Sequence, residues 1–324
     1  MTLSTFAFLH PVDDAALGGF RAALPGVEFL VPKEKEPPQG IERAEAASLS
    51  WGGPPLDDIL ARAPKLTWIH HRGAGIEKVA GHAGLLARGI AMTNGSGNHA
   101  PNMAEHVLGL MLGFARCFPR LIRAQQERRW DPPDFHELFE LSGQRLAIVG
   151  LGAIGNALAV RAAAFGMTVV GVNRSGAPAQ LPPGVSEVHR IDRLDDVLAT
   201  ADHVAVILPL TAETQGIFDA KRFAAMKRGA WFYNVGRGGL VDQDALLAAL
   251  RSGQLAGAGL DVTEPEPLPA DSPLWLEPNV VITAHSAGGT PKSDARWQSL
   301  LIDNLKRFAT GQPLRNVVDL KLGY

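Results

Sequence analysis

Residues 145–175, RLAIVGLGAIGNALAVRAAAFGMTVVGVNRS, decide the fold of this chain. A short apolar run of strand length opens the stretch, and the glycine pattern G-x-G-x-x-G follows at once at 150–155. An alanine-rich, helix-forming segment comes next, and a second β-rich run closes the stretch. Strand, glycine turn, helix and strand within about thirty residues is the context that separates a dinucleotide-binding turn from a chance match.

Each glycine of this turn has a physical purpose. Gly150 permits the tight turn, Gly152 lets a pyrophosphate approach the backbone, and Gly155 lets the helix pack closely on the strand. The N-terminus of the helix, at Ala153 and Ile154, offers N–H groups and a positive dipole to the phosphates. The alternative is a glycine-rich turn that binds nothing. The β-rich runs on both sides favour dinucleotide binding.

The residues that end the second β-rich run bear on cofactor choice. An Asp or Glu at this position hydrogen-bonds the ribose of NAD and repels the 2′-phosphate of NADP. This chain has the neutral Asn173 there, followed by Arg174 and Ser175. Because Arg174 can pair with a 2′-phosphate and Ser175 adds a donor, we expect a preference for NADP(H). The alternative is that Arg174 points into solvent and that NADP(H) and NAD(H) both bind.

The composition is that of a globular protein with about two domains. The chain has 324 residues, of which 46% are hydrophobic and 20% charged, and its formal net charge is −2. Without a long basic run, a nucleic-acid surface is not expected. The longest apolar stretch, near 107–115, is too short for a membrane span, and no signal peptide is expected. Cys117 is the single cysteine, so we expect a packed thiol in a cytoplasmic protein.

Strand and helix patterns alternate along the chain, which predicts an α/β fold with two doubly wound, parallel-sheet (Rossmann-like) domains. Further strands are expected at 5–9, 27–31, 46–50, 66–70, 204–208, 231–233, 257–260 and 280–283. Helices are expected at 13–23, 192–199, 219–226, 243–252 and 291–310. Residues 101–126 are expected to form one long helix, because Pro101 suits a first turn and apolar residues follow at helical spacing.

Three polar residues follow the predicted strands of the second half. Arg237 comes after 231–233, Glu266 after 257–260, and His285 after 280–283. Taken singly, they are better explained as a turn salt bridge, a solvated acid and a satisfied histidine. The carboxyl ends of parallel strands line the ligand crevice of such a sheet, so together they predict an active site beside the nicotinamide.

The residue types suit the reduction of a 2-oxo acid. Histidine titrates nearest neutral pH and can donate a proton to the developing alkoxide. A carboxylate beside the imidazole stabilises its charged form. Arginine holds a substrate carboxylate with two parallel hydrogen bonds. A metal site is not predicted, because His70, His71, His99, His106 and His136 lack a repeated ligand spacing.

Over essentially its whole length the sequence resembles the D-isomer-specific 2-hydroxyacid dehydrogenases. The matching stretches are GLGAIG (150–155), LPLTAET (208–214), NVGRGGLVD (234–242), GLDVTEPEPLP (259–269) and NVVITAHSAGG (279–289). MAEHVLGLML (103–112) is similar to the start of the family's interdomain helix, and RGAGIEKV (72–79) resembles its loop that binds the substrate carboxylate. The short GAG loop, LPLTAET and the C-terminal Gly-Tyr resemble the glyoxylate/hydroxypyruvate reductase branch.

The resemblance implies a role for each matching residue. Arg237 binds and polarises the substrate, His285 is the acid/base, and Glu266 is its partner. The amides of Ala74 and Gly75 bind the substrate carboxylate. The cofactor lies against the glycine turn, Asn173, Arg174, Ser175, Leu208, Pro209, Thr214, Val235, Gly236 and Asp261.

The sequence departs from the family pattern at a few positions. Glu77 stands where Asp is more usual, Thr263 where Phe is common, and Ser286-Ala287 where Ile-Gly is frequent. Glu264 is a second acid in the loop of Glu266, so whether it shares the role is left open. Trp51, Trp130 and Arg296 are candidates for the rim of the substrate pocket, with ordinary packing or a surface contact as the alternative.

These observations predict a two-domain reductase. Its dinucleotide-binding domain spans 99–289, and its substrate domain is built from 1–98 and 290–324. The expected reaction is NADPH-dependent reduction of small 2-oxo acids, glyoxylate and hydroxypyruvate foremost, by a homodimer that uses the helix from Pro101 at its interface.

Two alternative functions stay open at this stage. The first is an NAD-dependent D-2-hydroxyacid or phosphoglycerate-type dehydrogenase. This alternative is disfavoured because no additional regulatory domain is expected in 324 residues. The second is a non-catalytic nucleotide-sensing protein on the same scaffold, which the full Arg237, Glu266 and His285 set disfavours.

Overall fold

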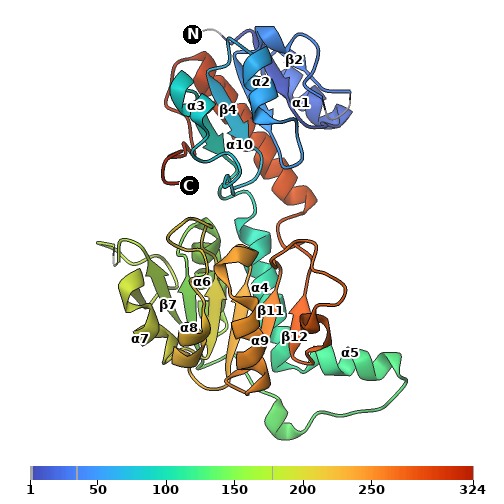
Figure 1. The fold of residues 1–324 in the computed structure, drawn as a ribbon, viewed down its shortest axis with the longest axis vertical. Coiled ribbons are helices and arrows are strands. Elements are labelled where there is room, and N and C mark those ends of the chain that lie inside the picture. Colours follow the sequence, from blue (N-terminus) through green and yellow to red (C-terminus); the bar gives the residue numbers. More distant parts are fainter. Residues whose placement is uncertain (1–2, 34–35, 177, 324) are drawn as a thin grey trace. The chain divides into compact units, whose positions relative to one another are not determined.

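The computed structural model describes residues 3–33, 36–176 and 178–323. The chain forms two compact units, one of Met1–Asn98 with Thr290–Tyr324 and one of His99–Gly289. Figure 1 shows that the blue N-terminal part shares its unit with the red C-terminal helix, so the chain leaves this unit and returns. Each unit contains one parallel sheet with helices, which confirms the predicted fold class. Tyr324, part of the predicted reductase-like terminus, lies outside the described residues.

The sheet of the second unit has seven parallel strands in the order β12-β11-β10-β9-β6-β7-β8. The order reverses at β6, because β7 lies on one side of it and β9 on the other. Ligands bind outside the carboxyl ends of the strands at such a point. The strands are β6 Arg145–Val149, β7 Thr168–Asn173, β8 Glu187–Arg190, β9 His203–Val206, β10 Ala230–Asn234, β11 Leu255–Leu260 and β12 Val280–Ile282.

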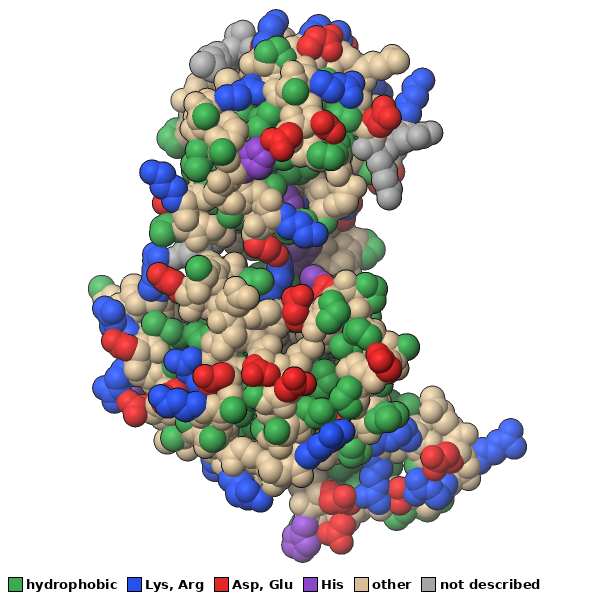
Figure 2. All heavy atoms as spheres, viewed as in Figure 1, with side chains coloured by type: hydrophobic (Ala, Val, Ile, Leu, Met, Phe, Trp, Pro, Cys, Tyr) green, Lys and Arg blue, Asp and Glu red, His purple; other side chains and the backbone are tan. Residues whose placement is uncertain are grey.

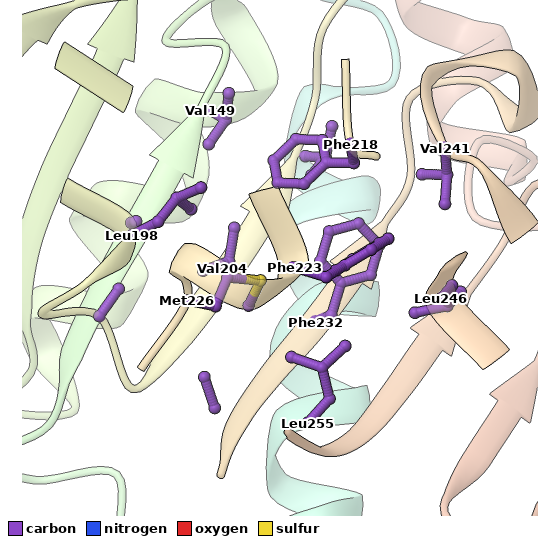
Figure 3. Close-up of a cluster of buried hydrophobic side chains, with 14 of the residues drawn as sticks. Val149, Leu198, Val204, Phe218, Phe223, Met226, Phe232, Val241, Leu246 and Leu255 are labelled. Carbon is purple, nitrogen blue, oxygen red and sulfur yellow. The ribbon is translucent and has the colours of Figure 1, made fainter. Parts of the chain in front are cut away.

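Helices cover both faces of this sheet because the buried strand residues alternate in direction. Leu146 and Ile148 pack with α4 Ala100–Ala115 and α6 Ala153–Ala164. Val149 packs on the other face with α7 Leu194–Leu198, α8 Ala220–Ala225 and α9 Gln243–Arg251. Figure 3 shows this second core, where the rings of Phe223 and Phe232 meet edge to face at 5.3 Å. Burying one such side chain stabilises the fold by about 1.5–3 kcal/mol.

The first unit has five parallel strands in the order β2-β1-β3-β4-β5. They are β1 Thr5–Phe8, β2 Glu28–Leu30, β3 Ala46–Leu49, β4 Trp68–His71 and β5 Ala91–Asn94. One face packs against α1 Asp14–Ala23 and α10 Pro291–Ala309, and the other against α2 Leu56–Arg62 and α3 Ala83–Arg88. Asp13, the N-cap of α1, accepts a hydrogen bond from the Ala16 amide at 2.7 Å.

The prediction of one helix over 101–126 is wrong. The structure has two helices, α4 and then α5 Phe118–Gln126, separated by Cys117 in the left-handed conformation with φ 55°. Pro119 explains the break, because it lacks an N–H and its ring clashes with the carbonyl four residues earlier in a continuous helix. Cys117 is only partly buried, and its thiol lies 3.6 Å from the Glu137 carbonyl oxygen.

Short 3₁₀ helices occur at η1 Ile41–Arg43, η2 Phe135–Glu137, η3 Ile191–Arg193, η4 Gly238–Leu240 and η5 Pro273–Leu276. Acidic and basic side chains are interspersed on the visible face of each unit (Figure 2). Of the helices in the described ranges, none combines the length and the apolar character that a membrane crossing needs.

Candidate active site

The glycine turn after β6 is packed on one side and open on the other. A Cβ on Gly150, whose φ is 109°, would lie 2.6 Å from the Ile207 carbonyl oxygen, and one on Gly155 would lie 2.5 Å from the Gly150 carbonyl oxygen. A Cβ on Gly152 would meet no atom within 4 Å. The open position lies at the N-terminus of α6, where the amides of the first turn have no intrahelical acceptor. These residues fit a dinucleotide pyrophosphate.

At the end of β7, Asn173 holds a turn. Its Oδ1 accepts hydrogen bonds from the Gly176 amide at 2.6 Å and from the Ser175 hydroxyl at 3.5 Å. Arg174 and Ser175 are exposed. Asn173 also pairs in register with Arg190, at the end of β8, a strand that sequence reasoning missed. The end of β7 therefore carries no acid and has two arginines nearby.

The loops after β9 and β10 continue this edge of the sheet. Thr214 closes the first loop on itself, because its hydroxyl donates to the Pro209 carbonyl at 2.7 Å. A Cβ on Gly236, which follows Val235, would lie 2.9 Å from the carbonyl oxygen of Leu208. The two loops are thus in direct contact, and Gly150 contacts the residue before Leu208. The structure brings most of the predicted cofactor residues to one edge.

Arg237 lies where the loop after β10 packs on the loop after β11. A Cβ on Gly238 would come within 1.9 Å of the Thr263 carbonyl oxygen, so only glycine permits this approach. Asn234 fixes the turn by donating to the Arg237 carbonyl at 2.9 Å. The Arg237 guanidinium donates to the Gly236 carbonyl at 2.7 Å. Arg237 is therefore held beside the segment that carries Glu266.

Glu266 and His285 form a hydrogen-bonded pair. His285 Nδ1 lies 2.8 Å from Glu266 Oε2, and the Thr263 amide donates to Glu266 Oε1 at 3.1 Å. With both oxygens accepting, the imidazole proton sits on Nδ1, and Nε2 faces away from the carboxylate. Glu264 instead makes backbone hydrogen bonds with the side chain of Gln243, so Glu266 is the acid at the imidazole.

Asp261 has partners that the sequence did not indicate. It was expected to contact the cofactor, but its side chain is only 1% exposed. Its carboxylate accepts hydrogen bonds from the Thr283 hydroxyl at 2.7 Å and from the Ser286 amide at 2.9 Å. The carboxylate is therefore committed to the loop that carries His285.

In the first unit, the loop after β4 holds the predicted carboxylate-binding residues. Its carbonyls are occupied, since Asn94 donates to Ala74 at 2.7 Å and Gly95 to Gly73 at 3.0 Å. Among the described residues, nothing accepts a hydrogen bond from the amides of Ala74 and Gly75. Trp51 lies beside this loop, with its ring centroid 4.9 Å from that of His71.

The other two candidates for the pocket rim have different surroundings. Trp130 lies between α5 and η2 with 95% of its surface exposed, so the structure does not place it in a pocket of its own chain. Arg296 donates to the Asn98 carbonyl at 2.6 Å. Among the residues that the structure describes, no three His, Cys, Asp or Glu side chains gather as metal ligands would.

The family model for the NAD-binding domain of D-isomer specific 2-hydroxyacid dehydrogenases matches residues 108–287. The chain belongs to this family. The matched residues lie in the second unit, so the glycine turn and the Arg237, Glu266 and His285 cluster sit on the family's NAD-binding domain.

Relatives within the family carry two kinds of name. A glyoxylate reductase of Korarchaeum cryptofilum is 33% identical over 300 residues, which cover 89% of this chain and 88% of the relative. A D-3-phosphoglycerate dehydrogenase of Methanocaldococcus jannaschii is 32% identical over 283 residues, 86% of this chain but 52% of the relative. The chain thus spans about half the length of the phosphoglycerate dehydrogenases that it matches.

Solved structures of family members match the whole chain. A D-isomer specific 2-hydroxyacid dehydrogenase of Xanthobacter autotrophicus Py2, in complex with NADPH and MES, has a TM-score of 0.86 and 35% identity, covering 100% of both chains. An NADPH-dependent glyoxylate/hydroxypyruvate reductase of Sinorhizobium meliloti, in complex with NADP and sulfate, has a TM-score of 0.83 and 30% identity. The match covers 99% of this chain and 100% of that chain.

Proposed function

We propose that this protein reduces small 2-oxo acids, glyoxylate and hydroxypyruvate foremost, to 2-hydroxy acids with NADPH. The observation that carries the proposal is the His285–Glu266 pair, with Nδ1 and Oε2 2.8 Å apart, whose loop after β11 packs on the loop that carries Arg237. This set supplies an acid, its partner and a carboxylate anchor, which together are what a 2-oxo acid reductase needs.

In the proposed mechanism, bound NADPH supplies the hydride that the carbonyl carbon of the substrate receives. His285, as imidazolium, donates the proton on Nε2 to the carbonyl oxygen, where negative charge develops. Glu266 keeps the Nδ1 proton in place and stabilises the imidazolium until the transfer. Arg237 binds the substrate carboxylate. The hydride and the proton convert the carbonyl into a hydroxyl group.

The loop after β4, in the first unit, is the second proposed binding element for the substrate carboxylate. We expect the unpaired amides of Ala74 and Gly75 to bind the substrate carboxylate, because Asn94 and Gly95 already fix the carbonyls of the loop. Trp51, 40% exposed beside this loop, is the candidate for the rim of the substrate pocket.

Oxidation of a phosphorylated 2-hydroxy acid with NAD is the second candidate, and the match to phosphoglycerate dehydrogenases favours it. A nucleotide-sensing protein without activity is the third candidate. The hydrogen bond between His285 and Glu266 counts against it, because a sensor has no need of an oriented acid/base.

A substrate panel tests the proposed function. We expect glyoxylate and hydroxypyruvate to give a higher kcat/KM with NADPH than branched or aromatic 2-oxo acids, measured from the absorbance of the nicotinamide. The difference should be about tenfold or more, since one methylene in a tight pocket is worth about 1–3 kcal/mol. A preference for phosphohydroxypyruvate would favour the phosphoglycerate alternative, and no turnover of any acid would favour the sensor.

For the cofactor, we expect wild-type protein to show a higher kcat/KM with NADPH than with NADH. The reason is that the end of β7 has Asn173 in place of an acid and Arg174 next to it. Asn173→Asp should reverse the preference, and Arg174→Ala should reduce it. If wild type prefers NADH, the argument fails. If NADPH is still preferred in Arg174→Ala, the 2′-phosphate is held elsewhere, with Arg190 the next residue to test.

We propose a homodimer, and we expect the α5 part of the predicted helix from Pro101 to lie at its interface. The apolar residues of α4 are buried inside their own unit, whereas Phe118, Ile122, Trp130 and Phe135 are 50%, 54%, 95% and 83% exposed. Light scattering should return about twice 34.5 kDa at micromolar concentration. Ile122→Glu should weaken the dimer, while Leu276→Glu, at a residue 85% exposed on η5, should not. A wild-type monomer would contradict the proposal.

A further inference from the structure

The loop that carries His285 has a backbone that needs support. Ala284 and His285 both adopt the left-handed conformation, with φ 48° and 55°. A side chain with a Cβ is disfavoured in this region, so such residues persist only where the surroundings hold them. The loop begins at Thr283, directly after β12, and its amides and side chains bond to two other elements.

The first support is Asp261, at the end of β11. Its backbone carbonyl accepts a hydrogen bond from the His285 amide at 2.6 Å. Its carboxylate accepts from the Ser286 amide at 2.9 Å, from the Ala287 amide at 3.2 Å and from the Thr283 hydroxyl at 2.7 Å. One buried acid therefore bonds to residues on both sides of the left-handed pair.

The second support comes from α4. His99, the N-cap of this helix, and Asn102 and His106 within it follow one another at spacings of three and four residues. His99 Nδ1 donates to the Gly288 carbonyl at 2.6 Å, and the Asn102 side chain donates to the Ala287 carbonyl at 2.7 Å. His106 Nε2 lies 3.0 Å from the Thr283 hydroxyl oxygen.

The number of protons available fixes which group donates in each hydrogen bond at the Thr283 hydroxyl. Its hydroxyl has one proton, which goes to the Asp261 carboxylate, because an ionised carboxylate can only accept. The hydroxyl oxygen must then accept from His106, which places the proton of that imidazole on Nε2. A directed chain therefore runs from His106 through Thr283 to Asp261, and Asp261 holds the amides of the loop.

We propose that His106 and Thr283, acting through Asp261, are positioning residues that hold His285 against Glu266. The inference rests on the proposed reductase function, since it concerns the acid/base of that reaction. It gives Asp261 a role in holding the loop of the acid/base, beside the cofactor contact expected from the sequence. Neither His106 nor Thr283 touches the substrate in this proposal; both act on the geometry of His285.

The kinetic test compares Thr283→Val, which removes the hydroxyl and keeps the shape, with Thr283→Ser, which restores it. We expect Thr283→Val to lower kcat about 10–100-fold, because a small misplacement of a reacting group costs about this much. The Kd of NADPH and the KM of glyoxylate should stay within about twofold. Thr283→Ser should recover most of kcat. His106→Gln, which keeps a hydrogen-bond donor, should have a higher kcat than His106→Leu.

Thr200→Val is the matched control, because the Thr200 hydroxyl donates to the Val197 carbonyl far along the chain from the loop. It should leave kcat unchanged. The proposal is overturned if Thr283→Val keeps wild-type kcat, or if it weakens NADPH binding while kcat is unaffected, since the second result would mean that the chain serves the cofactor.

A readout without turnover separates this proposal from the proposed function. In cofactor-free protein with ¹⁵N-labelled histidine, we expect the ring signals of His285 to show one tautomer, protonated on Nδ1 toward Glu266. The signals are assigned by their loss in His285→Gln. Thr283→Val should average the two tautomers, and Thr283→Ser should restore one. An unchanged His285 spectrum in Thr283→Val overturns the inference even if the reductase activity is found. Absence of that activity with the expected spectra refutes only the proposed function.

Discussion

Replacing His285 with alanine is expected to reduce turnover of 2-oxo acids by about 10²–10⁴-fold. The imidazole is the group placed to donate a proton, with Nδ1 held by Glu266 at 2.8 Å and Nε2 facing away. The fold and NADPH binding should survive, because the side chain is 49% exposed and contributes little to a core. Steady-state kinetics and fluorescence titration with NADPH measure the two effects separately. Near-normal turnover in His285→Ala would refute the assignment of the acid/base.

Glu266→Gln and Glu264→Gln form a matched pair for the partner of His285. Only Glu266 reaches the imidazole, so only Glu266→Gln should lower kcat. Reduction needs a proton on Nε2 that points at the carbonyl oxygen of the substrate, and the carboxylate fixes the ring by accepting from Nδ1. Without the carboxylate the ring loses this orientation, so kcat for reduction should fall in Glu266→Gln and stay near the wild-type value in Glu264→Gln. If Glu264→Gln lowers kcat and Glu266→Gln does not, the two acids were assigned in the wrong order.

The sequence was sufficient to predict the parts of the fold that depend on local chemistry. At Gly150 and Gly155 a Cβ would collide with backbone atoms. The G-x-G-x-x-G pattern at 150–155 is therefore a specific sign of this tight turn. The two parallel sheets follow from the β-α alternation, because a strand, a crossover helix and a further strand form a parallel pair. Arg237, Glu266 and His285 all follow strands of this sheet, so the carboxyl edge brings their loops together.

What the sequence could not show depends on single residues or on distant partners. The break between α4 and α5 arises from Pro119, while the apolar spacing on which the prediction relied continues through Phe114 and Phe118. The partners of Asp261 are 22 to 26 residues away, and His106 and Thr283 are 177 apart. Hydropathy patterns carry no information on such hydrogen bonds, so the support of the His285 loop became visible only in the structure.

Three of the buried histidines, His10, His70 and His203, are expected to make the protein sensitive to mild acid. Burial lowers the pKa of His10 to about 4, of His70 to about 3 and of His203 to about 4, from an ordinary value of 6.5. His203 is satisfied in its neutral form, since Nε2 bonds to Gln144 Oε1 and Nδ1 lies 3.0 Å from the Tyr233 hydroxyl oxygen. His10 and His70 belong to the first unit and His203 to the second.

We therefore expect the free energy of unfolding to fall as pH drops from about 6.5 toward 4. In this window the unfolded chain binds protons that the folded chain cannot, so stability is complete above the unfolded pKa and is lost below it. Each histidine contributes a slope of up to about 1.4 kcal/mol per pH unit, which is large against a total stability of about 5–15 kcal/mol.

Urea unfolding at a series of pH values measures the slope, and two variants at histidines assign it. His203→Asn removes a titrating group and keeps a donor and an acceptor, so the slope should fall by up to about 1.4 kcal/mol per pH unit. His136→Asn, at an exposed histidine, is the control and should leave the slope unchanged. The first unit, with two of the three histidines, should lose stability faster than the second on acidification. A wild-type slope near zero between pH 6.5 and 4 would mean that these imidazoles are protonated in the folded protein, against the burial that lowers their pKa values.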